Sequence, residues 1–249
     1  MRLRQMALVG KDLERLREDV VAVLKLGTPY SDPAVARFGL SNLVWPIGDT
    51  FLEIVSPAAE GTTAERLLEK RGGDGGYMTI FQTGDQRAAR ARAMDNGVRI
   101  VDTFDQEGAS YAHFHPKDLP GAIVSVDTMI PPDRWEWGGP GWQGQVRTEV
   151  ATRICGGSIE ISGAAMVAER WSAALGLPLR SGENQLSLIF EGGELRFVEP
   201  LEGPGAGLDT IDLEVRSAAV VMDAARRRNC LSERNEVLLC GTKVRLLEA

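Results

Sequence analysis

The residues best suited to chemistry are the two histidines of the chain, which lie close together near its middle. The segment SYAHFHP places Tyr111, His113 and His115 at every second position, and such residues share one face of a β-strand. Two imidazoles and a carboxylate such as Glu53 form a ligand set suited to iron(II), zinc or manganese. Without a metal, a histidine beside Glu53 could act as an acid–base pair. The alternatives are a hydrogen-bonded or solvent-facing pair, and a strand end at His115, which directly precedes a proline.

The composition excludes several classes of function. Apolar residues make up 43% of the 249 residues and charged residues 25%, as in an ordinary folded protein. The net charge of -7 comes from acidic residues interspersed with arginine, without a basic block, so nucleic acid is not an expected partner. No apolar run of about 18 residues exists, so we expect no membrane association and a cytoplasmic protein. Three widely spaced cysteines without a CxxC motif indicate buried fillers rather than disulfides or a zinc knuckle.

One structural unit recurs four times along the chain: a short strand, an amphipathic helix, and then two or three strands separated by turn residues. In the first copy, Asp12 is an expected N-cap, and the helix that follows it should end at Gly27. Its apolar stripe consists of Leu13, Leu16, Val20 and Leu24. This order of elements predicts an α+β fold in which each copy covers one sheet face with its helix. The other face would be covered by a second copy, leaving a cavity between the two sheets.

The segment PPDRWEWGGPGWQGQ predicts a connection between two domains. We expect an N-terminal domain at residues 1–130, with copies at about 1–57 and 74–128, a linker at 131–149, and a C-terminal domain with two copies at 150–249. The three linker tryptophans are expected to wedge the domains together rather than to bind a ligand, because tryptophan buries a large area at interfaces.

Three segments together with the fourfold repeat resemble the vicinal-oxygen-chelate superfamily of glyoxalases, epimerases, extradiol dioxygenases and bleomycin-resistance proteins. These segments are SNLVWPIGDTFLEIVSP, FHPKDLPGAIVSVD and ERWSAALGLPL. The resemblance implies tandem βαβββ modules, four in this chain, paired into two cup-shaped domains. It does not imply one activity, because that fold carries lyases, isomerases, dioxygenases and binding proteins.

Members of that superfamily hold a divalent metal between the first and last strands of two modules. By this resemblance, the first module offers Gln5 and Glu53. Period-two alternation along their strands predicts that both side chains share the face that lines the cup. The second offers Met78, or Tyr77 if the register slips by one residue, and Ser125, so half of the expected ligands are missing. In the C-terminal domain the positions fall near Gly156, Arg196, Asp209 and Val244, within one residue. Arginine repels a metal cation, so this domain is expected to be structural, or to bind an anion through Arg196, unless Arg196 forms a surface ion pair.

Three functions follow from these patterns. The first is a lyase, isomerase or dioxygenase that acts on a small oxygenated molecule in the N-terminal cup. There Glu53 would be a metal ligand or base, Gln5 a neutral ligand and a histidine the proton shuttle. The metal would be iron, zinc, manganese or nickel, and a metal-free enzyme is the alternative. Expected pocket residues are Trp45, Phe51, Met78, Tyr111 and Ser125, although strand aromatics are more often core. The second function is sequestration of a small molecule, and the third is an assembly module or homodimer without catalysis.

Overall fold

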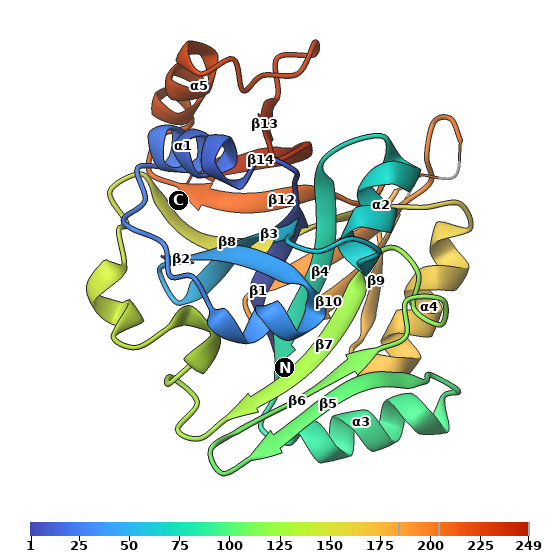
Figure 1. Cartoon of the computed structure of the whole chain (residues 1–249). Coiled ribbons are helices and arrows are strands. Elements are labelled where there is room, and N and C mark those ends of the chain that lie inside the picture. The colour runs from blue at the N-terminus through green and yellow to red at the C-terminus, as the bar shows by residue number, and fades with distance from the viewer. Residues whose placement is uncertain (184, 204, 249) are drawn as a thin grey trace. The chain divides into compact units, whose positions relative to one another are not determined.

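The computed structural model describes residues 1–183, 185–203 and 205–248 and confirms the α+β class (Figure 1). Its helices and strands are β1 (Arg2–Val9), α1 (Leu13–Leu24), β2 (Leu40–Ile47), β3 (Thr50–Pro57), α2 (Thr63–Arg71), β4 (Gly75–Gln82), α3 (Gln86–Asp95), β5 (Ile100–Gln106), β6 (Ala109–Phe114), β7 (Ile123–Met129), β8 (Ala151–Glu160), α4 (Ala164–Leu175), β9 (Leu179–Ser181), β10 (Leu186–Phe190), β11 (Gly193–Val198), β12 (Gly207–Val215), α5 (Ala218–Arg227), β13 (Val237–Leu239) and β14 (Thr242–Glu248). Short 3-10 helices are η1 (Pro33–Phe38), η2 (Glu136–Gly138) and η3 (Trp142–Gln145).

The strands form two seven-stranded mixed sheets, with the orders β2-β3-β1-β4-β7-β6-β5 and β13-β14-β12-β8-β11-β10-β9. The residues cluster into two compact units. Unit 1 consists of Met1–Arg4, Met78–Glu136 and Gly156–Asp209, and unit 2 of Gln5–Tyr77, Trp137–Cys155 and Thr210–Ala249. Unit 1 therefore holds most of the second and third copies of the repeat, whereas unit 2 holds most of the first and fourth.

The four copies differ in their number of strands. The second and third have the βαβββ order, whereas the described parts of the first and fourth are βαββ, which agrees with the expected unit of two or three strands after each helix. In the first copy, η1 and an isolated bridge between Tyr30 and Val44 replace the strand. Pro29 and Pro33 explain the loss, because proline has no backbone N–H to donate to a ladder.

Helix α1 shows how the first copy covers its sheet. Asp12 caps it as expected by accepting a hydrogen bond from the Arg15 backbone N–H at 3.0 Å. Leu16 and Val20 of the expected stripe are buried. The helix ends at Leu24 rather than at Gly27, because Lys25 takes the left-handed conformation (φ 57°) and donates its backbone N–H to Val21.

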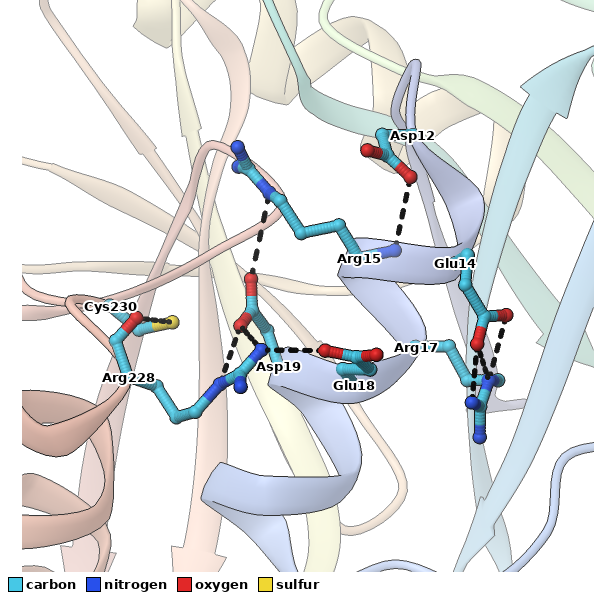
Figure 2. A network of polar contacts seen from close by, with 8 residues as sticks. All are labelled: Asp12, Glu14, Arg15, Arg17, Glu18, Asp19, Arg228 and Cys230. Atoms are coloured by element: carbon cyan, nitrogen blue, oxygen red, sulfur yellow. Dashed lines mark hydrogen bonds and ion pairs between the residues drawn. The ribbon is translucent and has the colours of Figure 1, made fainter.

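Helices α1 and α5, both in unit 2, are tied together by a polar network (Figure 2). Arg228, at the end of α5, lies 2.8 Å from the carboxylate of Asp19 and 3.2 Å from that of Glu18. Asp19 is buried on α1, which a carboxylate tolerates when it is paired. The next residue but one, Cys230, is buried and free, and burial raises its pKa to about 11. The network thus joins the first copy to the fourth.

All three cysteines are buried and free, as the sequence predicts. Among the described residues, none of the helices has the length and apolar character needed to cross a bilayer.

Candidate functional site

One position recurs in all four copies and fixes the register of the candidate site. In each copy, the first strand and the last strand pair in parallel. The first-strand residue that lies six positions before the start of the helix (α1, α3, α4 or α5) is paired with one residue of that last strand. Its partners are, in chain order, Glu53, Ser125, Arg196 and Arg245. Two residues earlier, the first strands carry Gln5, Met78, Gly156 and Thr210.

This register agrees with the expected positions in the first three copies and selects Met78 over Tyr77. In the fourth copy it is shifted by one residue, to Thr210 and Arg245 instead of Asp209 and Val244; Val244 pairs with Ile211. Arg196 is buried, with 6% exposure, because its strand β11 lies inside the sheet between β8 and β10. Its cross-strand partners are Ser158 of β8 and Ser187 of β10. The interpretation of Arg196 as a surface ion pair is therefore wrong.

The most complete polar cluster lies in unit 2 around Glu53. The Gln5 Nε2 group donates a hydrogen bond to Glu53 Oε2 at 2.8 Å, and Asn42 Nδ2 donates to Glu53 Oε1 at 2.6 Å. All three residues are buried, with at most 7% exposure. As period-two alternation predicts, Gln5 and Glu53 share a face, because β1 and β3 pair in parallel with Ala7 opposite Glu53. Asn42 comes from β2, whose Val44 lies opposite Glu53.

The surroundings of Glu53 favour its protonated form. Burial raises the pKa of the Glu53 carboxyl, hydrogen bonds from Asn42 and Gln5 offset part of that rise, and the Asp32 carboxylate adds to it. Burial also raises the pKa of Tyr77 to about 12, with a further contribution from the negative charge of Glu53. A carboxyl whose pKa is raised in this way is better matched to accepting and returning a proton near neutral pH than an exposed one.

Two of the three expected aromatic pocket residues, Trp45 and Phe51, lie on opposite faces of this part of the sheet. Trp45 is opposite Leu52 in the β2–β3 pair, so it alternates away from Glu53 and is fully buried in the core. The expectation that Trp45 and Phe51 line one pocket is therefore wrong. Phe51 shares the face of Glu53 and packs edge-to-face on Trp142, with ring centroids 4.9 Å apart. Gly138 also touches this ring, since an added Cβ would lie 2.4 Å from Phe51 Cε1.

The histidine segment lies in unit 1. Tyr111 and His113 share a face of β6 as expected, and their rings stack with centroids 4.3 Å apart. The Tyr111 hydroxyl donates to Asp102 Oδ2 at 2.6 Å. The expectation that His115 continues this row is wrong, because β6 ends at Phe114, as the alternative of a strand end before Pro116 predicts. His115 directly precedes the turn that begins at Pro116, and its Nδ1 atom accepts a hydrogen bond from the Lys117 backbone N–H at 3.1 Å.

Met78 and Ser125 are both buried in unit 1. The Ser125 hydroxyl donates to the Asp127 carboxylate, and the cross-strand partner of Ser125 is His113. The sequence patterns did not identify three polar partners: Asn42 of Glu53 in unit 2, and Asp102 of Tyr111 and Asp127 of Ser125 in unit 1. Asp127 is two residues after Ser125, so alternation along β7 is a signal that could have revealed it.

No family model matches the chain. Over 134 residues it is 26% identical to an ethylmalonyl-CoA/methylmalonyl-CoA epimerase from Cereibacter sphaeroides, in an alignment covering 51% of this chain and 98% of that protein. A solved structure of a hypothetical protein from Staphylococcus aureus matches all of this chain and 99% of its own, with a TM-score of 0.70 and 12% identity. A variant of 4-hydroxymandelate synthase from Streptomyces coelicolor matches 92% of this chain and 75% of its own, with a TM-score of 0.69 and 17% identity. The chain has the glyoxalase-like fold of the vicinal-oxygen-chelate superfamily.

The vicinal-oxygen-chelate fold implies a divalent metal, which the donors of this chain do not fit. Such an ion takes about six oxygen or nitrogen ligands, or about four if it is zinc. Both oxygens of Glu53 already accept amide hydrogens, and the equivalent positions of the second copy supply a thioether and a neutral hydroxyl. Within the described parts of the chain, no group of three or more His, Cys, Asp and Glu side chains could hold a metal ion. Glu53, His113 and His115 therefore do not form the expected ligand set.

Proposed function

We propose that this vicinal-oxygen-chelate protein binds a small oxygenated organic molecule, an acid or its thioester, and moves a proton within it as an isomerase does. Glu53 is the proton acceptor. The observation that carries this proposal is the buried Glu53 carboxylate, held by the amides of Gln5 and Asn42 and with a raised pKa. The epimerase name of the relative from Cereibacter sphaeroides supports the same reaction type.

In the proposed reaction, Glu53 takes a proton from the carbon next to the carbonyl group of the ligand. The C–H bond breaks, its electron pair moves to the carbonyl oxygen to give an enolate, and the proton binds a Glu53 oxygen. Return of the proton from Glu53 restores the carbonyl and the original configuration, whereas a proton that water delivers to the opposite face of the enolate restores the carbonyl with the other configuration. The raised pKa of Glu53 reduces the difference between its pKa and that of the weakly acidic C–H group, and this favours the proton transfer. Gln5 and Asn42 hold the carboxylate in one orientation.

A second candidate is a small-molecule sequestration protein. Met78 and Ser125 favour it, because they stand where the second copy would supply metal ligands and neither carries a charge. Such a protein needs a shaped site and no catalytic group. In this case Glu53, Gln5 and Asn42 would contribute hydrogen bonds to ligand binding. The sequence-based expectations of a cytoplasmic location and a homodimer stay predictions under both functions.

Solvent exchange tests the proposal. The protein is incubated with methylmalonyl-CoA in D2O, and deuterium at the α-carbon is followed by mass spectrometry. Wild type should exchange this proton, Glu53→Gln should lose exchange by about 100-fold or more, as expected for loss of a general base, and the exposed variant Glu60→Gln should match wild type. Exchange that persists in Glu53→Gln would show that Glu53 is not the proton acceptor. Stabilisation by the thioester without exchange in wild type would favour sequestration.

A further inference from the structure

In the third and fourth copies, an arginine occupies the last-strand position that Glu53 holds in the first copy. These residues are Arg196 in unit 1 and Arg245 in unit 2. A guanidinium is always positively charged and carries only hydrogen-bond donors. It therefore repels cations and attracts anions at this position. The fourth copy shows how such an arginine can be oriented toward a ligand.

The Arg245 side chain lies on the face of its sheet that is turned away from helix α5. The buried residues Ile211 and Val244 pair across β12 and β14, and α5 packs against β13 and β14 (Figure 1). Because side chains alternate along a strand, Lys243 and Arg245 project from the opposite face. We call this the open face of the fourth copy, since the Arg245 side chain is 47% exposed there.

Asp212 holds the Arg245 guanidinium in a fixed orientation. The two residues are directly paired between β12 and β14. Arg245 Nε lies 2.9 Å from Asp212 Oδ1, and Arg245 Nη2 donates a hydrogen bond to Asp212 Oδ2 at 3.2 Å. The Asp212 side chain is only 2% exposed. The buried carboxylate therefore takes the inner edge of the planar guanidinium. The outer edge, between Nη1 and Nη2, carries parallel N–H groups that fit a carboxylate or phosphate in bidentate contact.

Lys243 adds a second positive charge to the open face. It precedes Arg245 by two residues on β14, so both side chains project from the same face. Lys243, Arg245 and Asp212 together leave an excess of positive charge, although the whole chain carries a net charge of -7. The neighbouring ion pair of Arg153 with Glu214 is neutral as a pair. The excess charge therefore lies at the outer edge of Arg245.

We propose that Arg245 and Lys243 bind an oxyanion of a small organic molecule, a carboxylate or a phosphate group, on the open face of the fourth copy. Asp212 fixes the guanidinium before the ligand arrives, which lowers the entropy cost of binding. Lys243 strengthens the attraction as a compact point charge. This inference goes beyond the proposed function and does not rest on the role of Glu53.

An NMR titration of the full chain tests the site. Sodium malonate and sodium phosphate are the probes, and sodium chloride at the same ionic strength is the control for screening. The 15N–1H signal of Arg245 Nε, assigned by its absence from Arg245→Lys, should shift in a saturable way with malonate or phosphate and not with chloride. Tighter binding of malonate would identify a carboxylate ligand, and tighter binding of phosphate would identify a phosphate group. Both results would support the inference.

Two variants test the two residues, with the backbone amide signals of β14 as the readout. Arg245→Lys keeps a positive charge beside Asp212 but loses the planar fork, so it should weaken binding about tenfold or more. Lys243→Gln leaves the ion pair of Arg245 with Asp212 intact and should weaken binding about two- to fivefold, as expected for one partly exposed charge. Arg227→Lys and Lys70→Gln are the matched controls, because both residues are exposed in unit 2. They should bind as wild type does.

Shifts that do not saturate, or that chloride reproduces, would overturn the inference, because the anions would then act only through ionic strength. Unchanged affinity in both Arg245→Lys and Lys243→Gln would also overturn it, because the anion would then be bound elsewhere. If Arg245→Lys does not fold, wild type and Lys243→Gln decide. An Arg245 Nε signal that stays unmoved in wild type, or an affinity that Lys243→Gln leaves unchanged, would then overturn the proposal.

Discussion

The Gln5 amide meets the Glu53 carboxylate at 2.8 Å, although 48 residues separate them in the chain. Parallel pairing of β1 with β3 brings them together, because it places Ala7 opposite Glu53 and leaves Gln5 two residues away on the same face. A carboxylate buried in this way keeps its charge only if hydrogen bonds replace the water it has lost. The amides of Gln5 and Asn42 supply such bonds, and this makes the protonation of Glu53 a sensitive property of unit 2.

Glu53 should make stability depend on pH. Its folded-state pKa lies above its value in the unfolded chain, so the native state binds the proton more tightly. This contribution to the free energy of unfolding is fully present below the ordinary Glu pKa of about 4.5 and is lost as pH rises through the raised native pKa. Wild type should therefore lose stability relative to Glu53→Gln as pH rises from about 4 to 8.

Urea unfolding of wild type and Glu53→Gln across this pH range measures the difference, and the exposed variant Glu60→Gln is the control. Replacing the carboxylate also changes the bonds to Gln5 and Asn42, which adds an offset that does not vary with pH. The contrary outcome is a difference in the free energy of unfolding between wild type and Glu53→Gln that stays constant, or a wild type that gains stability relative to the variant as pH rises. Either result would show that Glu53 is not buried with a raised pKa.

Alternation and repetition were enough to predict the α+β fold, the fourfold repeat and the shared face of Gln5 and Glu53. These features depend on residue periodicity, which the sequence displays directly. The contact of Tyr111 with His113 followed from the same rule. His115 does not follow this rule, because the end of a strand is set by the turn that comes after it. In that turn, the Lys117 backbone N–H donates a hydrogen bond to the His115 ring.

Asn42 could not be predicted as a partner of Glu53, because its place depends on the β2–β3 register and on the Asp32 N–H rather than on a local pattern. The 3-10 helix before β2 was not predicted for a similar reason. The 3-10 helix η1 and the bridge at Tyr30 satisfy backbone groups that a ladder would otherwise pair. Burial of Arg196 likewise depends on which strands flank β11, and that order is a property of the whole sheet.

Metal content tests whether the Glu53 cluster is a metal site. Protein purified without chelator or metal-binding tag should contain well below one equivalent of iron, zinc, manganese or nickel, because both Glu53 oxygens accept amide hydrogens. Elemental analysis of wild type, Glu53→Ala, His113→Ala and His115→Ala provides the measurement. Near-stoichiometric metal that disappears in Glu53→Ala would mean that Gln5 and Asn42 rearrange around an ion, and it would overturn the metal-free proposal.

Gly138 should be essential for packing over the Glu53 face. A methyl group at this position would lie 2.4 Å from Phe51 Cε1, so Gly138→Ala should lower the free energy of unfolding by about 1–3 kcal/mol through overpacking. Gly144→Ala is the matched control in η3, because nothing lies within 4 Å of its added Cβ. Denaturant melts of both variants compare the effects. Equal stability of the two variants would show that the 137–145 segment does not press on Phe51.

The network in Figure 2 should contribute to the stability of unit 2 through Arg228. Arg228→Met leaves the buried Asp19 with Arg15, whose nitrogen lies 3.9 Å away, so we expect a fall in Tm of roughly 2–4 °C. Arg227→Met is the control, because Arg227 pairs within α5 with exposed Asp223. Combining Arg228→Met with Asp19→Asn should cost less than the sum of the two, since each removes the same interaction. Strictly additive losses, measured by thermal melts at low salt, would mean that Arg228 and Asp19 stabilise the α1–α5 contact independently.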